Sequence, residues 1–253
     1  MCTLALYFHC FASYPVIVAA NRDEHYDRPT APPALLNSEP AMIAGKDLRA
    51  GGTWLGVNEY GLAVGILNRR INGTTLPAEV ARSRGLLCMD LLKCRSAAAA
   101  ADFLATHESS YNPFTVVFAD DNHAYVAYNN SAIVIVPLDA GLHVFSSAAE
   151  IDLRSAKADR AHRLFAALAN QEPKPALEPQ QFLQSLQKIL ADHSLNDGSA
   201  DPGDAICVHR DVSGTVSSSV IFYAEAKRRF ETFHCLGAPC QNSFGLSLQL
   251  PIR

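Results

Sequence analysis

Hydrophobic and polar positions along the chain form alternating blocks of two kinds. Short apolar runs rich in β-branched and aromatic residues occur near the start, the middle and the end, and they predict β-strands. Longer runs with helical spacing separate these blocks, and they come in two pairs. The predicted order is therefore strands, two helices, strands, two helices, strands.

The first block opens with two predicted strands, "CTLALYFHCF" and "YPVIVAAN", which meet at "ASYP". We expect a loop rich in charge and proline next, in "NRDEHYDRPTAPPALLNSEP". Two further strands then flank the turn signal "NEYG" in "GGTWLGVNEYGLAVGILN". The first helix pair is predicted in "SRGLLCMDLLKC", with Ser83 as N-cap, and in "SAAAAADFLATH", from near Ser96.

The second half of the chain repeats this pattern. It has four β-type runs, then predicted helices near 157–168 and 179–191, and it closes with "AICVHR", "TVSSSVIFY" and "FETFHCL". Strand blocks interrupted by helix pairs predict an α+β fold with two central sheets and helices outside them. No change of composition marks a boundary, so we expect residues 1–253 to form a single domain.

Composition narrows the class of protein. The chain is 49% hydrophobic and 18% charged, which is ordinary for a globular protein with a sizeable core. The net charge of −4 and the scattered lysines and arginines argue against a nucleic-acid partner. No apolar run reaches the roughly 20 residues of a membrane span.

The seven cysteines point to a reducing compartment, because their number is odd and their spacing irregular. The apolar start lacks the basic region of an export signal and is interrupted by His9, Tyr14 and Pro15. We therefore expect a cytoplasmic protein. Cys207 with His209, or His234 with Cys235, is not matched by a second pair at zinc-finger spacing, so no metal site is predicted.

Cys2 is the first candidate for chemistry. Removal of Met1 would leave a thiol and a free α-amine on one residue, and an amine with a pKa near 7.7–8.0 can accept the thiol proton at neutral pH. The alternative is an inert cysteine, since many chains begin Met-Cys by chance. Arg22 and Asp23, at the end of the second predicted strand, could tune the charge around such a terminus or form an ordinary solvated cluster.

Asn68 ends another predicted strand, and an asparagine amide is a suitable donor to an oxyanion. A turn or cap asparagine is the other interpretation. Gly51 and Gly52 precede Trp54, which we read either as a wall of a substrate site or as a core residue. The serines of "VSSSV" could supply hydroxyls to a pocket, although a half-exposed strand face is the more common explanation.

Several segments together resemble one protein family. They are "MCTLALYF", "ANRDEHYDRPT", "AGKDLRAGGTWLGVNEYGLAVGILNRR", "SRGLLCMDLL" and "YNPFTVVFAD", in this order, and later "AICVHR" with "GTVSSSVIFY". They are similar to the NRDE family, which includes transport and Golgi organisation protein 2. This family is related to the N-terminal nucleophile (Ntn) hydrolases of the choloylglycine hydrolase and penicillin V acylase group. The resemblance implies a four-layer αββα sandwich with two mainly antiparallel sheets.

The resemblance also implies roles for individual residues. Cys2 matches the nucleophile and Asn68 the oxyanion asparagine of those acylases. Arg22 and Asp23 are adjacent here, whereas the acylases separate the equivalent pair, and Asp23 is the better match for the group that holds the amine. Ser147, or its neighbour Ser146, replaces a second asparagine.

A late arginine of those acylases, which supports the nucleophile, corresponds by helix context to Arg160 or Arg163.

Two functions then stay open. The first is hydrolysis of an amide or thioester of a small or acyl substrate, without a cofactor. The second is binding of haem, lipid or acyl-CoA without turnover. Both hypotheses imply a small-molecule partner, and neither fixes the oligomeric state.

Overall fold

The computed structural model describes residues 2–69, 81–107, 110–129, 132–147, 155–170, 178–195 and 199–253. Its secondary structure follows the predicted order of strands and helix pairs. The chain divides into two compact units, which are described separately here. The first comprises residues 1–27, 140–227 and 231–247, and the second comprises residues 28–139, 228–230 and 248–253.

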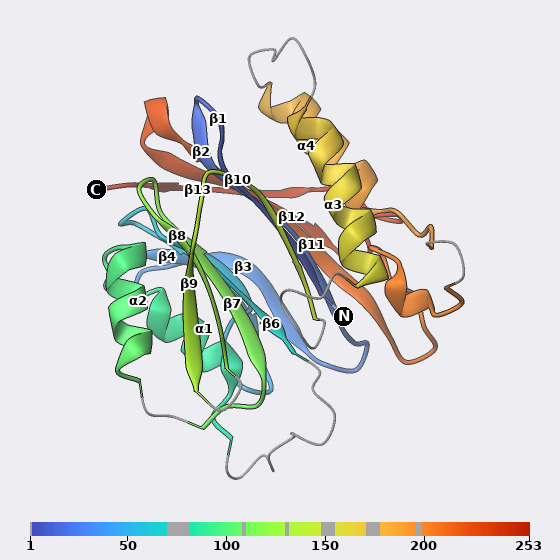
Figure 1. Cartoon of the computed structure of the whole chain (residues 1–253), viewed down its shortest axis with the longest axis horizontal. Helices are drawn as coiled ribbons and strands as arrows, with labels where there is room; N and C mark the ends of the chain where they lie inside the picture. Colours follow the sequence, from blue (N-terminus) through green and yellow to red (C-terminus); the bar gives the residue numbers. More distant parts are fainter. Residues whose placement is uncertain are drawn as a thin grey trace. The chain divides into compact units, whose positions relative to one another are not determined.

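The first unit is built around a six-stranded sheet with strand order β10-β1-β2-β11-β12-β13. The strands of this sheet are β1 (Thr3–Phe11), β2 (Tyr14–His25), β10 (Gly141–Ser146), β11 (Ser213–Ala224), β12 (Arg229–Leu236) and β13 (Leu246–Pro251). The first two residues of β12 and the last four of β13 are counted with the second unit in the division above. Helices α3 (Ala156–Ala169) and α4 (Pro179–Leu190) lie against the sheet (Figure 1). The β1–β2, β1–β10 and β2–β11 pairs are antiparallel.

The core of this unit lies between the sheet and its two helices. Tyr7, Ile17 and Phe222 from the strands meet Phe165 of α3 and Leu186 of α4, and all five are fully buried. The hydroxyl of Tyr7 donates to the backbone carbonyl of Phe165 at 2.8 Å, which satisfies a polar group inside the core. The buried faces of β1, β2 and β11 therefore fix where α3 and α4 pack.

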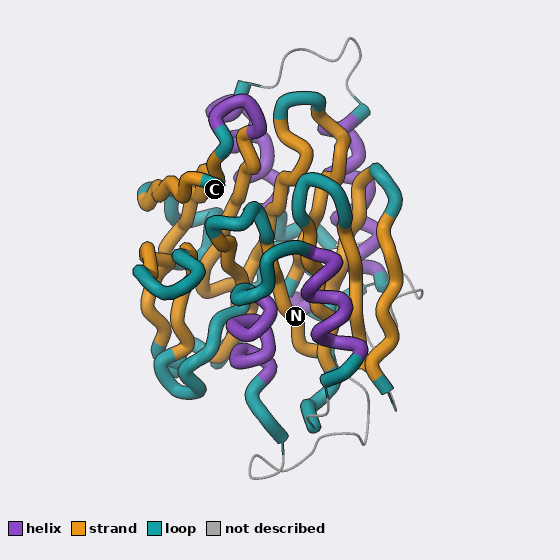
Figure 2. The backbone as a smooth tube through the Cα atoms, turned by 90° about the vertical axis from the view of Figure 1, so that its left-hand side faces the viewer, coloured by secondary structure: helices purple, strands orange, loops and turns teal. Residues whose placement is uncertain are grey.

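The second unit contains a seven-stranded antiparallel sheet with its strands in chain order. They are β3 (Thr30–Leu36), β4 (Met42–Asp47), β5 (Leu55–Asn58), β6 (Ala63–Asn68), β7 (Phe114–Ala119), β8 (Ala124–Asn129) and β9 (Ile133–Leu138). Helices α1 (Arg84–Leu91) and α2 (Ala97–Ala105) cover one face. Strands account for more of the backbone than helices do (Figure 2).

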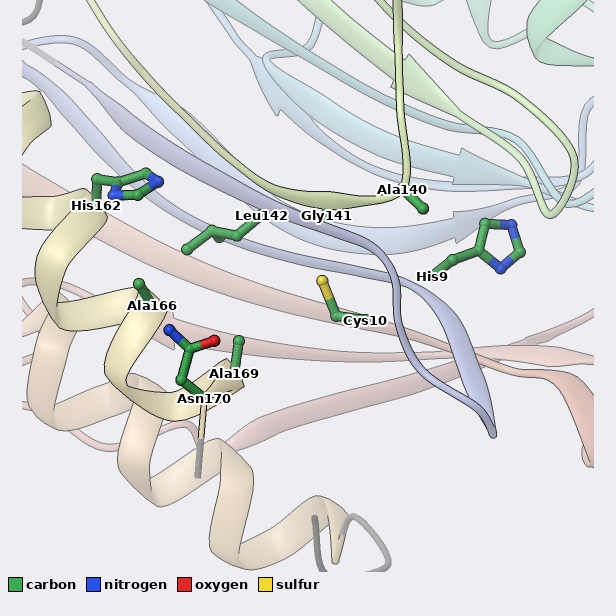
Figure 3. Close-up of a pocket in the computed structure, with 9 residues that line it drawn as sticks. All are labelled: His9, Cys10, Ala140, Gly141, Leu142, His162, Ala166, Ala169 and Asn170. Atoms are coloured by element: carbon green, nitrogen blue, oxygen red, sulfur yellow. The ribbon is translucent and has the colours of Figure 1, made fainter. Parts of the chain in front are cut away.

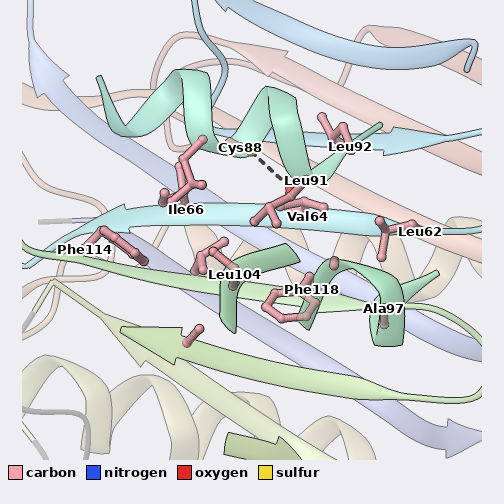
Figure 4. Close-up of a cluster of buried hydrophobic side chains, with 14 of the residues drawn as sticks. Leu62, Val64, Ile66, Cys88, Leu91, Leu92, Ala97, Leu104, Phe114 and Phe118 are labelled. Carbon is pink, nitrogen blue, oxygen red and sulfur yellow. Dashed lines mark hydrogen bonds between the residues drawn. The ribbon is translucent and has the colours of Figure 1, made fainter. Parts of the chain in front are cut away.

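Apolar side chains of β6, β7 and the two helices form the core of this unit (Figure 4). Leu62, Val64, Leu91 and Leu104 all belong to this buried cluster. The Cys88 thiol donates to the Val64 carbonyl at 3.8 Å. Cys88 is therefore a core residue.

The helix starts in the second unit follow the capping rules to different degrees. The helix predicted to start near Ser96 does so, and the Ser96 side chain accepts the Ala99 N–H at 3.1 Å as its N-cap. Ser83 occupies the N-cap of α1, but its side chain makes no capping hydrogen bond.

Two sequence predictions of local structure are wrong. The segment containing "NRDEH" was expected to be a loop, but residues 21–25 continue β2, because β11 pairs with them through Asp23 and beyond. Part of the remaining segment forms β3. Conversely, "AICVHR" is not a strand: only His209 makes an isolated bridge, to Gly214, and the Cys207 N–H is taken by the Asp192 carbonyl.

Candidate functional site

Cys2 lies at the start of β1, half-buried between the ends of β2 and β10. Its backbone nitrogen is 3.1 Å from the Ser147 hydroxyl oxygen, which accepts its hydrogen bond. Its thiol sulfur is 3.4 Å from the backbone nitrogen of Asp23 and 3.7 Å from the Asp23 carbonyl oxygen. Residues 2, 23 and 147 are thus brought together by strand pairing across three elements of one sheet.

The Asp23 carboxylate has two buried partners. Its Oδ2 accepts from Lys157 Nζ at 2.9 Å and its Oδ1 accepts from the Thr215 hydroxyl at 2.6 Å. The side chains of Lys157 and Asp23 are 0% and 3% exposed. Because burying a charge is costly unless it is paired, the two groups hold each other in place. The resemblance assigned this carboxylate to the α-amine, and the structure shows that it also binds Lys157 and Thr215.

The residues around Cys2 determine the protonation state of its thiol. Burial, and then the negative charge of Asp23, raise the pKa of Cys2 above its ordinary value, while the charge of Lys157 acts in the opposite direction. The net result is a protonated thiol at neutral pH. A nucleophilic Cys2 therefore needs a base next to it.

The neighbours of these residues also have definite positions. Arg22 is buried, with its guanidinium 3.7 Å from the Glu24 carboxylate. Ser146 pairs with Thr3 in the sheet and its hydroxyl lies 3.1 Å from that of Ser155, the N-cap of α3. Of the two serines left open by the sequence, Ser147 is therefore the one that contacts Cys2.

The two arginines of α3 differ in their surroundings. Arg160 is half-buried and its Nε is 2.5 Å from the Asp192 carboxylate, a hydrogen bond that raises the pKa of the guanidinium. Arg163 is exposed. Through this hydrogen bond to Asp192, Arg160 links α3 to the segment that follows α4.

Asn68 and Trp54 belong to the second unit. Asn68 is the last residue of β6, is exposed, and pairs with Phe114 of β7. The Trp54 ring lies over Gly45 of β4, where a Cβ atom would be 2.6 Å from the ring. A glycine at position 45 is what allows the indole to approach this strand so closely. Arg70, next to the Asn68 segment in the sequence, lies outside the described residues.

A family model for transport and Golgi organisation 2 matches residues 1–234. The chain belongs to this family. The mouse Transport and Golgi organization 2 homolog is 32% identical over 112 residues, which is 43% of this chain and 40% of the mouse protein. The bovine Transport and Golgi organization protein 2 homolog is 26% identical over 243 residues, 83% of this chain and 82% of that protein.

Solved structures show which fold this member of the family has. Penicillin V acylase from Agrobacterium tumefaciens matches with a TM-score of 0.59 at 14% identity, over 91% of this chain and 82% of that one. A mutant conjugated bile acid hydrolase from Clostridium perfringens matches with a TM-score of 0.56 at 11% identity, over 92% and 88%. The fold is therefore that of the Ntn hydrolases, an α+β sandwich with two antiparallel sheets, and the predicted fold class is confirmed.

A separate cavity of about 390 Å³ lies in the first unit between the β1–β10 edge and α3 (Figure 3). His9, Cys10 and Leu142 line its strand side, and His162, Ala166 and Asn170 line its helix side. Cys2 and Asp23 are not among its lining residues. Within the described residues, no helix is long and apolar enough to cross a membrane.

Sequence reasoning missed two groups of polar residues in this family member. Lys157 was treated only as the start of a helix, and Thr215 only as part of a strand, although both bind Asp23. No spacing rule links residues 134 and 192 positions apart. The second group is a cluster of cysteine and histidine side chains around Cys207, described below.

Proposed function

We propose that this protein is an Ntn-type cysteine hydrolase, acting on an amide or thioester of a small or acyl substrate. The observation that carries the proposal is the position of Cys2, whose nitrogen meets Ser147 and whose thiol meets the backbone of Asp23 in front of a buried Lys157. The solved structures with this fold include an acylase, a bile acid hydrolase and an N-acylethanolamine-hydrolyzing amidase. Their names support the reaction class.

The reaction begins with activation of the thiol. Loss of Met1 would free the α-amine of Cys2, with an ordinary pKa of about 7.7–8.0. This amine takes the thiol proton, and the sulfur attacks the substrate carbonyl. The C–N or C–S bond of the substrate then breaks, and the leaving group takes the proton from the ammonium. Water, deprotonated by the same amine, attacks the thioester and releases the acid and the thiol.

The surrounding residues take distinct roles in this proposal. The Ser147 hydroxyl orients the amine by accepting from it, at the 3.1 Å contact already present. Asp23 fixes the end of β2 against the thiol through Lys157 and Thr215, and Arg22 adds positive charge nearby. Asn68 supplies the oxyanion donor that the family resemblance implies, which is worth about 3 kcal/mol or roughly 10²–10³ in rate.

Trp54 and Arg160 are proposed as groups near the substrate, and the ligand is a small molecule handled in the cytoplasm.

A second function, binding of haem, lipid or acyl-CoA without turnover, is favoured by one observation. Burial raises the pKa of the Cys2 thiol, and wherever Met1 is retained the backbone nitrogen of Cys2 is a peptide amide that cannot act as its base. The state of the N-terminus therefore separates the two functions.

Peptide mapping by mass spectrometry, after brief exposure to limiting iodoacetamide, tests the proposal directly. We expect Met1 to be absent and Cys2 to be labelled before the other six cysteines, with the half-buried Cys10 as the internal reference. Incubation with N-acyl amides and acyl thioesters should then leave an acyl adduct on Cys2 that Cys2→Ala lacks and Cys10→Ala retains. Retention of Met1, or labelling of Cys2 no faster than Cys10, would overturn hydrolysis in favour of binding.

A further inference from the structure

Four metal-binding side chains gather in the first unit, outside the Cys2 contacts. His193 follows α4, Cys207 and His209 precede β11, and Cys240 follows β12. One ligand atom from each of the four lies within 4.8 Å of those of the other three. Three separate segments of the chain thus converge on one point. Cys207 and His209 were weighed as a metal-binding pair from their spacing, but their partners could not be recognised, because His193 and Cys240 are 14 and 33 residues from Cys207.

The distances within this cluster match those around a tetrahedral metal ion. With bonds of about 2.3 Å to sulfur and about 2.05 Å to nitrogen, Zn²⁺ places two sulfur ligands about 3.8 Å apart and a sulfur and a nitrogen about 3.6 Å apart. The sulfurs of Cys207 and Cys240 are 3.7 Å apart. His209 Nε2 lies 3.6 Å from the Cys207 sulfur and 3.3 Å from the Cys240 sulfur. Three ligands therefore already have the required separations.

His193 is oriented as the fourth ligand. Its Nδ1 is 3.1 Å from the Cys207 carbonyl oxygen, and its ring centroid is 4.9 Å from that of His209. A histidine that donates through Nδ1 to a carbonyl carries its lone pair on Nε2, which is the usual arrangement for a metal-bound imidazole. This contact fixes the tautomer before any metal arrives.

We propose that Cys207, Cys240, His209 and His193 bind one Zn²⁺ ion. Two thiolates and two imidazoles in a tetrahedron are typical of zinc, and four protein ligands make a closed site whose role is structural. The ion ties the chain after α4, the segment before β11 and the turn after β12 to one another. This site does not depend on the proposed hydrolysis at Cys2.

The surrounding backbone holds the ligands in place. The Cys207 N–H donates to the Asp192 carbonyl at 2.9 Å, and the Val208 N–H donates to the Thr215 hydroxyl at 2.9 Å. Ile206 and Val208 are buried on either side of Cys207. His193 and Cys240 are exposed, which gives an ion a path into the site.

Metal analysis of the full chain, purified under reducing conditions without chelators, tests the proposal. We expect one equivalent of zinc per chain by elemental analysis. Exchange with Co²⁺ should give the intense visible absorption of a tetrahedral ion and a thiolate charge-transfer band. Cys240→Ser and His193→Ala change exposed residues, so both variants should fold and lose the metal. Cys10→Ser, a half-buried cysteine of the same unit, and Cys2→Ala should keep it.

Other outcomes would overturn the site. A Cys207–Cys240 disulfide in the protein as isolated, found by peptide mapping, would show that the two thiols form a redox pair instead. Absence of zinc together with absence of the cobalt spectrum in the fully reduced protein would reject metal binding altogether. Equal zinc content in Cys240→Ser and Cys10→Ser would place the metal elsewhere. Since Cys2→Ala removes only the proposed nucleophile, failure of hydrolysis leaves the metal result unaffected.

Discussion

Each unit contains a buried asparagine that holds the end of a helix. In the second unit, Asn58 Nδ2 donates to the carbonyls of Leu92 and Cys94, both at 2.8 Å, just beyond α1. In the first unit, Asn21 Nδ2 donates to the carbonyls of Leu190, the last residue of α4, and Ile206, at 2.8 and 2.9 Å. Both amides satisfy carbonyls that a helix end or a turn leaves without backbone partners.

The oxygen atoms of the two amides differ in what they bind. Asn58 Oδ1 accepts from the N–H groups of Tyr60 and Leu62, so it closes the turn that follows β5. Asn21 Oδ1 accepts from the Ser218 hydroxyl on β11, a residue distant in sequence. The next positions along β2 lead to Asp23, with its buried Lys157. A buried asparagine therefore completes a turn in the second unit, whereas in the first unit it begins a buried polar network.

The difference between the two asparagines separates a polar contact that folding explains from a polar network that points to function. A buried asparagine that completes a turn is explained by folding alone. A buried charged pair is weak evidence for stability, since apolar residues of similar size serve as well or better. The Asp23–Lys157 pair beside the Cys2 thiol is therefore the feature of the first unit that folding does not explain.

Removal of Lys157 is expected to have the largest effect. Lys157→Met leaves the Asp23 carboxylate buried without its cation, which should cost about 3–5 kcal/mol of unfolding free energy. Lys93→Met, at the exposed pair with Asp90, should cost less than about 1 kcal/mol. Urea denaturation measures both. Adding Asp23→Asn to Lys157→Met should restore part of the lost unfolding free energy. An equal loss in Lys157→Met and Lys93→Met would show that the buried pair is no more important for stability than the exposed one.

Acid should act on the first unit through His234. Burial lowers the pKa of His234 to about 4, from an ordinary value near 6.5, and its Nδ1 is 2.8 Å from the Ser219 hydroxyl. Below pH 6.5 the unfolded chain binds a proton that the folded chain does not bind. Stability that is complete above pH 6.5 should then fall by about 1.4 kcal/mol per pH unit down to pH 4, about 3 kcal/mol in all.

Denaturation midpoints of the native chain and His234→Gln, measured from pH 7 to pH 4, isolate this contribution. The variant keeps a hydrogen-bonding side chain for Ser219 but does not titrate in this range. Its stability should therefore decline less steeply with acid. Parallel curves for the two proteins would show that His234 does not carry the effect.

Asn21→Ala and Asn58→Ala sharpen the comparison at a smaller scale. Each variant removes the donor to two buried backbone carbonyls, and we expect each to lower the free energy of unfolding by about 1–3 kcal/mol. Only Asn21→Ala should also change the rate at which Cys2 reacts with iodoacetamide, because β2 carries the backbone of Asp23 to that thiol. If Asn58→Ala alters that rate equally, the distinction between the two asparagines is wrong.

Local patterns explain how much of the fold was predictable. Apolar spacing placed the four helices, and the start of α2 near Ser96 was predicted because the signals for a helix start are local. The strand through "NRDEH" was missed because charged residues disfavour strands in isolation, and only the partner β11 makes them one. The "AICVHR" segment was misread for the opposite reason, since its apolar residues are buried without pairing in a sheet.

The candidate site divides in the same way. The resemblance supplied Cys2, Asp23 and Asn68, because family motifs are continuous in sequence. The partners of Asp23 and the ligands around Cys207 come from segments that only the folded chain brings together. Lys157 in particular has no local signal, since a lysine in the first turn of a helix is ordinarily a solvated residue.

The strand order of the first unit also determines when the surroundings of Cys2 take shape during synthesis. The partners of β1 and β2 include β10 and β11, which leave the ribosome long after residue 2. At about 5–20 residues per second, completion of β11 follows the appearance of Cys2 by roughly 10–40 s. Throughout that interval the end of the nascent chain is open to aminopeptidases, while most of the second unit, residues 28–139, is already available to fold. Removal of Met1, which the proposed hydrolysis requires, would therefore come before closure of the sheet around Cys2.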